Sequence, residues 1–317
     1  MNHLTISEAM DRACAAVGIR PPRSYRDGRW TRTDTSSGKN GKGDGSVMVD
    51  DERVTAWNWQ TGEKETVWLS SRERTAEDRK VTAARISAAD EKRRRAAVRA
   101  AEIASALLSS ARQSNHPYLA AKGFREEQTL VVTAADVREL AGHVNHHGEF
   151  IPADYLVAGE RAILIPARRA GNVTSAQLVW ENGTKKFLFG GEIGGASHRL
   201  ATGVYTWLCE GYATGLSIRA ALKGLRVRAT VLCCFSASNI VAVAQHVQGR
   251  AFVATDNDKP LEQFAGLGTG EHYARLTSLP YAMPAAVGDD FNDMHQRDGI
   301  FAVQRVLTAV MARRVAT

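Results

Sequence analysis

The chain has 317 residues and a mass of 34.5 kDa, and its composition, 44% hydrophobic and 24% charged, is that of an ordinary globular protein. It contains no run of roughly 18 apolar residues, which excludes a membrane-spanning protein, and it is too apolar for a mostly disordered or collagen-like chain. The N-terminal residues lack the apolar core of a signal peptide. The four cysteines show no CxxC pair and no disulfide-framework spacing. We therefore expect a cytoplasmic protein with reduced thiols and no membrane partner.

The net charge of +7 is concentrated in one segment. Residues 72–112 contain 11 basic and 6 acidic side chains, a net charge of +5. Residues 1–71 and 113–200 are each neutral, and residues 201–317 have a net charge of +2. A local basic block favours a polyanionic partner.

Residues 1–71 predict a helix followed by a small Trp-rich β module. Apolar residues first recur at helical spacing, Pro21-Pro22 ends that pattern, and residues 24–69 alternate like strands between turn signals. Four of the six tryptophans fall in this segment. Trp57 and Trp59 are two residues apart and would share one face of a sheet, so they are candidate template contacts that stack on bases. The alternative is that these rings form the core of the module.

Residues 72–112 predict one long, basic, exposed helix that links this module to the rest of the chain. The segment has twelve alanines, the basic run Lys92-Arg93-Arg94-Arg95, and no Gly or Pro. Arg93 and Arg94 are further candidate template contacts, and the alternative is an ordinary solvated helix.

Residues 113–200 predict a mixed α+β region. Residues 162–166 and 175–180 read as two strands across a turn at Gly171-Asn172, and residues 185–189 read as a third strand.

Residues 201–317 predict an α/β domain, because strand and helix patterns alternate and the strands are continuously apolar. Strands are expected at 204–209, 227–235, 250–255 and 281–287, and helices at 214–222, 239–247, 270–279 and 300–313.

Carboxylates follow three of these predicted strands. Glu210 follows the first, Asp256-Asn257-Asp258 follows the third, and the run 288–293, which includes Asp289 and Asp290, follows the fourth. The carboxyl ends of parallel strands meet at one edge of a sheet, where ligands bind. Crowded carboxylates repel one another unless cations lie among them, and hard oxygen ligands suit Mg²⁺ or Mn²⁺.

This pattern resembles the TOPRIM domain of primases, topoisomerases and some nucleases, whose signature is a Glu after the first strand and a DxD motif after a later strand. The matching residues are Glu210 in LCEGYATGLS and Asp256 and Asp258 in FVATDND. The amino-acid sequences of these segments, together with the GDDFND run, are similar to those of primases of conjugative plasmids and phages. HPYLAAKG (116–123), the segment 164–191 and YRDGRWTRTDT (25–35) fit the same group.

The resemblance implies a DNA primase, a nucleotidyltransferase of the DNA-directed RNA polymerase type that makes short RNA primers on single-stranded DNA during plasmid, phage or mobile-element replication. It implies that Asp256 and Asp258 bind Mg²⁺ or Mn²⁺, with Asp289 or Asp290 as further ligands, and that Glu210 is a ligand or a general acid/base. The basic residues expected to hold template or nucleoside triphosphate are Lys185, Lys186, Arg168, Arg169 and Lys259. A replicative helicase is a candidate partner.

Two alternatives remain open at this point. A TOPRIM nuclease would use the same carboxylates to cut DNA, and a non-catalytic factor would only bind single-stranded DNA. The chain also departs from cellular primases, which carry an N-terminal zinc ribbon, because Cys14 is its sole cysteine before residue 200. No zinc is therefore expected.

Overall fold

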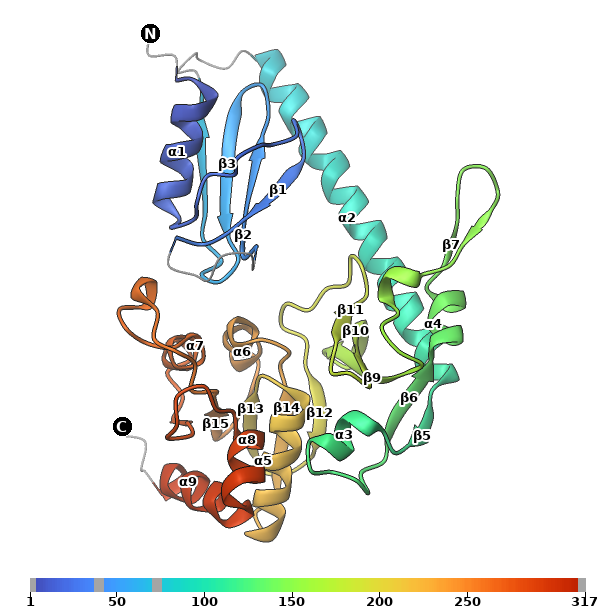
Figure 1. The fold of residues 1–317 in the computed structure, drawn as a ribbon, viewed down its shortest axis with the longest axis vertical. Coiled ribbons are helices and arrows are strands. Elements are labelled where there is room, and N and C mark those ends of the chain that lie inside the picture. Colours follow the sequence, from blue (N-terminus) through green and yellow to red (C-terminus); the bar gives the residue numbers. More distant parts are fainter. Residues whose placement is uncertain (1–3, 37–42, 70–75, 313–317) are drawn as a thin grey trace. The chain divides into compact units, whose positions relative to one another are not determined.

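The computed structural model describes residues 4–36, 43–69 and 76–312. They form two compact units (Figure 1). The N-terminal unit comprises Met1–Arg85 and Pro260–Thr269, and the core unit comprises Ile86–Lys259 and Gly270–Thr317. The ends of two predicted helices, residues 72–75 and Arg313, lie outside the described residues. The four-segment division of the sequence stays a prediction.

The N-terminal unit consists of one helix and a four-stranded antiparallel sheet, which confirms the predicted Trp-rich β module. Its elements, with the strands in spatial order, are α1 (Ile6–Ala16), β1 (Trp30–Thr33), β2 (Gly45–Val49), β3 (Arg53–Asn58) and β4 (Lys64–Trp68). α1 begins with a capping box, in which the Thr5 hydroxyl accepts from the backbone of Glu8 and the Glu8 carboxylate accepts from the backbone of Thr5. Apolar residues of α1 pack on one face of the sheet.

The long helix α2 (Ala76–Ser110) confirms the helical prediction but corrects the expectation that it is an exposed linker. Lys92 to Arg95 are exposed, as predicted. Farther along, Ala100, Ile103, Ala104 and Leu107 are buried in a core with the antiparallel sheet of the core unit. Their i, i+3, i+4, i+7 spacing makes one apolar stripe. The C-terminal half of α2 is therefore part of the core unit.

The α+β region of the core unit is built on a five-stranded antiparallel sheet. Its strands, in spatial order, are β11 (Lys185–Phe187), β10 (Asn172–Trp180), β9 (Arg161–Arg169), β6 (Thr129–Thr133) and β5 (Arg112–Ser114). The sheet is accompanied by α3 (Pro117–Ala121), α4 (Ala134–Leu140), the hairpin β7 (His143–Val144) and β8 (Phe150–Ile151), and a 3₁₀ turn at Asp154–Leu156. The predicted hairpin of β9 and β10 pairs as expected.

The C-terminal sheet is the predicted parallel sheet with one unpredicted antiparallel edge strand. Its strands, in spatial order, are β12 (His198–Ala201), β14 (Ala229–Cys233), β13 (Tyr205–Cys209), β15 (Ala251–Ala254) and β16 (Tyr281–Ala282). β12 runs antiparallel to β14, and the other pairs are parallel. β16 is shorter than the strand predicted over 281–287.

Helices cover both faces of the C-terminal sheet. They are α5 (Tyr212–Gly224), α6 (Ala237–Ala244), α7 (Thr269–Leu276), α8 (Phe291–Asp298) and α9 (Ile300–Ala312). Side chains of α5, α8 and α9 share one core with Trp207 and Phe252, whereas α6 and α7 pack on the opposite face with Leu208 and Val253. The first core also contains Ile163 of β9, so the antiparallel and C-terminal sheets share a hydrophobic core.

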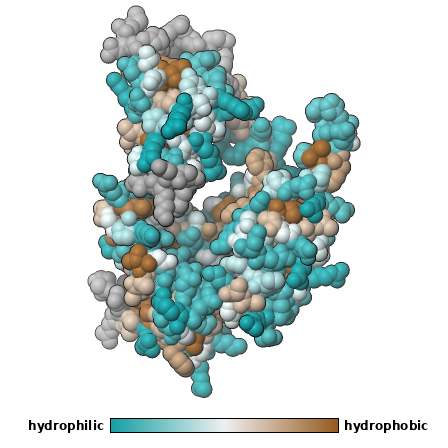
Figure 2. Space-filling model, in the orientation of Figure 1, coloured by the Kyte–Doolittle hydropathy of each residue, from teal (hydrophilic) through white to brown (hydrophobic). Residues whose placement is uncertain are grey.

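None of the described helices is both long and apolar enough to cross a bilayer. On the face shown in Figure 2, hydrophobic residues are scattered among hydrophilic ones.

Candidate active site at the carboxyl edge of the C-terminal sheet

The predicted carboxylates gather at one edge of the C-terminal sheet. β13 and β15 are parallel neighbours, so Glu210, directly after β13, and Asp256, shortly after β15, leave the sheet on the same side. The third acidic segment lies beside the second, because the Asn257 N–H donates to the Asp289 carbonyl (2.9 Å) and the Gly288 N–H donates to the Asn257 carbonyl (2.6 Å). Three segments distant in sequence thus form one acidic edge.

The carboxylates of this edge act on one another electrostatically. Burial and the neighbouring charges of Asp258 and Asp290 raise the pKa of Glu210 to about 7. Burial, followed by repulsion from Glu210 and Asp290, raises the pKa of Asp256 well above its usual range. Lys185 opposes both shifts and lowers the pKa of each group. Four of the predicted acids, Glu210, Asp256, Asp258 and Asp290, therefore belong to one electrostatic cluster with Lys185.

The other carboxylates have additional structural roles. Oδ2 of Asp258 accepts a 2.8 Å hydrogen bond from the Gly270 N–H at the start of α7. Asp290 is the N-cap of α8, and its Oδ1 accepts from the N–H groups of Asn292 (2.6 Å) and Asp293 (2.9 Å). Oδ2 of Asp289 accepts a 2.5 Å bond from Arg297. Asp289 thus shares the Arg297 guanidinium with Asp298, and of the pair Asp289 and Asp290 it is Asp290 whose charge acts on Glu210 and Asp256.

The donor set suits a magnesium-type ion with few protein ligands. Oδ1 of Asp256 is buried and has no hydrogen-bond partner, although a buried carboxylate oxygen normally has one. Among the described residues, no three His, Cys, Asp or Glu side chains form a ready-made metal cage. Mg²⁺ usually keeps several waters and takes one or two carboxylates together with substrate phosphates. Asp256 and Asp258 can supply such a pair.

The predicted basic residues do not form one group: they differ in their surroundings and in their contacts. Lys185 acts on the acidic cluster, whereas Nζ of Lys186 donates to the Tyr155 carbonyl (2.5 Å). Lys259 is exposed directly after Asp258.

Arg168 and Arg169 line a pocket of about 820 Å³, together with two residues that the sequence had not indicated, Arg199 and His246. Arg169 forms a 2.7 Å ion pair with Glu192, and Arg168 donates to the Gly171 carbonyl (3.2 Å). Arg199 escaped notice because it lies on β12, the unpredicted edge strand. The sequence offers no apolar run at His198–Ala201, because this strand is only partly buried.

The candidate template contacts on α2 are exposed and paired within the helix. Arg93 forms a 2.7 Å ion pair with Asp90, and Arg94 lies 3.9 Å from Glu91. Trp57 and Trp59 lie in the N-terminal unit, with ring centroids 5.5 Å apart.

Comparison with known proteins gives one family match, and no curated protein matches the chain. Two solved structures from bacteriophage T7 are similar to it. One contains the lagging-strand DNA polymerase with primase domains of two gp4 subunits bound to an RNA/DNA hybrid and dTTP (14% identity, TM-score 0.34, 48% of this chain, 78% of that chain). The other is the primase fragment of the primase-helicase protein (14% identity, TM-score 0.35, 48% of this chain). This chain spans 64% of that second structure.

The family match covers residues 205–300, which include all five carboxylates of the acidic edge, and the family is the Toprim domain. The resemblance seen in the sequence motifs is confirmed for this segment. Residues 205–300 therefore match the Toprim domain both in their sequence motifs and in the family comparison.

Proposed function

We propose that the protein is a DNA primase that joins ribonucleotides on a single-stranded DNA template by metal-dependent nucleotidyl transfer. The observation that carries the proposal is the acidic edge within the Toprim match, where burial and the nearby charges of Asp258 and Asp290 raise the pKa values of Glu210 and Asp256. Such a cluster is balanced when a divalent cation binds.

In this proposal, Asp256 and Asp258 hold Mg²⁺ or Mn²⁺, and Asp290 adds negative charge nearby. The bound cation supplies neutralisation of the charge on the reacting phosphates. The 3′-hydroxyl oxygen attacks the α-phosphorus of a nucleoside triphosphate, the bond to the pyrophosphate oxygen breaks, and the hydroxyl proton passes to a base. Glu210 suits that base, because a pKa of about 7 is matched to proton transfer near neutral pH.

In this proposal, the basic residues bind the phosphate groups of the nucleoside triphosphate and of the template. Lys185 is the candidate to bind the triphosphate, and its support is that its charge acts on Glu210 and Asp256. The pocket of Arg168, Arg169 and Arg199 offers fixed cations for template phosphates. Lys186 and Lys259 are weaker candidates, one bonded to a carbonyl and the other exposed.

The partners in the proposal are single-stranded DNA and ribonucleoside triphosphates. The resemblance of the motifs to plasmid and phage primases adds a replicative helicase as a candidate partner and replication of a plasmid, phage or mobile element as the setting.

One assay separates the primase from the two alternatives that use the same fold. The full chain is incubated with single-stranded DNA, labelled ribonucleotides and Mg²⁺ or Mn²⁺. Short labelled RNA supports the primase, shortened DNA indicates a nuclease, and neither product indicates a factor that only binds. Asp256→Asn and Asp258→Asn should each abolish synthesis. The matched control is Glu126→Gln, an exposed carboxylate of the core unit, which should leave synthesis unchanged. Primer synthesis that survives Asp256→Asn would overturn the site assignment.

A further inference from the structure

The sheet of the N-terminal unit has two very different faces. α1 packs on the first through buried apolar residues, and the buried members of this core are Ala9, Met10, Ala13, Cys14, Val17, Ile19, Val47, Val49, Val54, Ala56 and Leu69. Because side chains alternate along a strand, the intervening residues project from the opposite face.

That opposite face, here called the open face, is rich in aromatic and basic residues. The strand pairing places on it Trp30, Arg32, Ser46, Met48, Arg53, Thr55, Trp57, Lys64, Thr66 and Trp68. None of these ten residues is a carboxylate. Trp30 is 44% exposed and Trp68 is 38% exposed, so these rings do not form a buried core.

Three indole rings form a continuous cluster on the open face. The ring centroid of Trp57 lies 5.9 Å from that of Trp30 and 5.5 Å from that of Trp59, which directly follows β3. Trp59 is 40% exposed, and its Nε1 donates a 2.9 Å hydrogen bond to Oγ of Ser46, which fixes the ring orientation. The cluster is an ordered aromatic surface in contact with solvent.

Cations sit against these rings. The Arg32 guanidinium lies 3.8 Å from the centroid of the Trp59 ring, and Nζ of Lys64 lies 4.0 Å from that of the Trp57 ring. Arg32, Trp57 and Lys64 belong to one row that crosses the sheet through Ser46. Each cation thus lies next to the face of an aromatic ring. A single-stranded nucleic acid, in which bases alternate with phosphates, can use both groups at once.

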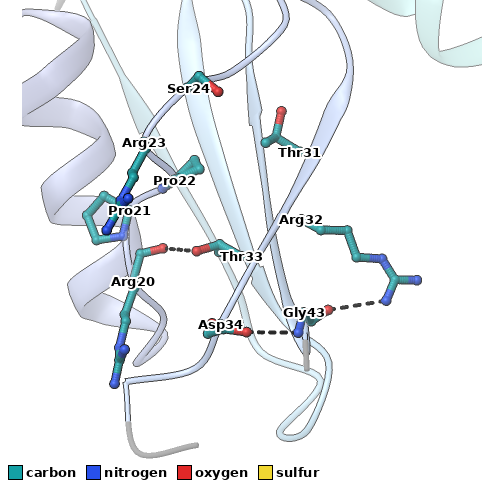
Figure 3. Close-up of a pocket in the computed structure, with 10 residues that line it drawn as sticks. All are labelled: Arg20, Pro21, Pro22, Arg23, Ser24, Thr31, Arg32, Thr33, Asp34 and Gly43. Atoms are coloured by element: carbon teal, nitrogen blue, oxygen red, sulfur yellow. Dashed lines mark hydrogen bonds between the residues drawn. The ribbon is translucent and has the colours of Figure 1, made fainter. Parts of the chain in front are cut away.

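More cations lie at the edge of the sheet. A pocket of about 620 Å³ beside β1 is lined by Arg20, Arg23 and Arg32 (Figure 3). The acid in its lining is Asp34, whose Oδ1 accepts a 2.9 Å hydrogen bond from the Gly43 N–H. The pocket adds positive charge at the β1 edge of the sheet, where Arg32 extends to one side of the strand and Arg20 and Arg23 lie on the other (Figure 3).

We infer that the open face binds single-stranded DNA, with bases stacked on Trp30, Trp57 and Trp59 and with phosphates held by Arg32, Lys64 and the pocket arginines. Single strands fit because their bases have free faces, whereas those of a duplex are already stacked. The identification of the ligand as DNA rests on the proposed primase function. The inference that bases stack on the exposed tryptophans does not depend on that function.

Tryptophan fluorescence tests this inference directly. Trp180 and Trp207 are fully buried in the core unit, so quenching on titration with an oligothymidylate of about 12 nucleotides reports on the open face. The full chain is titrated in EDTA without nucleotides, which keeps the measurement independent of primer synthesis. Trp59→Ala and Trp30→Ala should each weaken binding by about tenfold. Lys64→Ala should reduce the salt slope of log K by about 0.7.

The matched control is Phe301→Ala, which removes an aromatic ring that is 72% exposed on α9 and should leave the affinity unchanged. Thermal unfolding confirms that each variant is folded. Wild-type affinity in both tryptophan variants would overturn the inference, as would equal binding of a duplex of the same length or tighter binding of the matching RNA. Asp256→Asn should retain wild-type binding, so a failed primase assay and a failed binding assay remain distinguishable.

Discussion

The backbone N–H of Gly270 donates a 2.8 Å hydrogen bond to Oδ2 of Asp258, which fixes the second carboxylate of the DxD motif to the start of α7. The same glycine stands close to the first carboxylate. A Cβ atom at residue 270 would lie 2.5 Å from the Asp256 carbonyl oxygen and 2.5 Å from Oγ1 of Thr255, distances that real Cβ atoms do not show. The acidic edge therefore depends on a residue without a side chain at this position.

Gly270→Ala should displace both aspartates and lower primer synthesis by at least about tenfold, because the added methyl group forces the backbone apart. It should also reduce the free energy of unfolding by about 1–3 kcal/mol, measured by urea denaturation. Gly194→Ala is the matched control, since a Cβ there meets nothing within 4 Å. Equal activity of the two variants would contradict this role of Gly270.

Lys185 and Lys186 are adjacent, yet their replacement should have different effects. Lys185 lowers the pKa of Glu210 and Asp256, so Lys185→Ala should shift the pH profile of kcat toward higher pH and reduce kcat by about tenfold. Nζ of Lys186 donates to the Tyr155 carbonyl instead, and Lys186→Ala should change kcat by less than about twofold. Similar pH profiles for the two variants would show that Lys185 does not act on the acids.

The raised pKa of Glu210 also predicts a pH dependence of stability without metal. In the folded chain this carboxyl holds its proton up to a pKa of about 7, above its ordinary value of 4.5, so the folded state binds more protons in that window. Stability should therefore fall as pH rises from about 4.5 to 7. Thermal unfolding in EDTA should show this loss, and Glu210→Gln should reduce it. Added Mg²⁺ should raise Tm more at pH 8 than at pH 5.5, and a Tm without metal that rises across this window would contradict the assignment.

The basic pocket predicts a defect in template binding rather than in chemistry. Arg199→Ala should raise KM for the DNA template by about tenfold and leave kcat nearly unchanged, because the proposed role of this pocket is to bind template phosphates and no carboxylate of the acidic edge lines it. Arg305→Ala, an exposed arginine on α9, is the control. A fall in kcat with unchanged KM would show that this pocket does not bind the template.

The part of the acidic edge formed by Glu210 and the DxD motif was predictable from the sequence, because these acids lie at or just after the ends of the apolar strands β13 and β15, and parallel strands end together. Three other features could not be predicted in this way. β12 is short and half-exposed, so it has no apolar run, and Arg199 was missed with it. α8 was hidden because Asp290 was interpreted as a ligand alone, although its side chain also caps the helix. The burial of Ala100 and Leu107 depends on a sheet formed by residues farther along the chain, which local helix propensity does not reveal.

The basic run of α2 predicts a modest salt dependence, since the helix itself neutralises part of its charge. Arg93 pairs with Asp90 at 2.7 Å and Arg95 with Glu91 at 3.0 Å, and the side chains of all three arginines from Arg93 to Arg95 are at least 75% exposed. Replacing Lys92 and these arginines by Gln should reduce the salt slope of single-strand binding by about one to two units, less than four free cations would give. The double variant Asp90→Asn, Glu91→Gln is a control with the opposite expected effect. It removes the acids that pair with the arginines, so the salt dependence of single-strand binding should become steeper. If neither variant changes the slope, α2 does not contact the template and its charge only keeps the helix solvated.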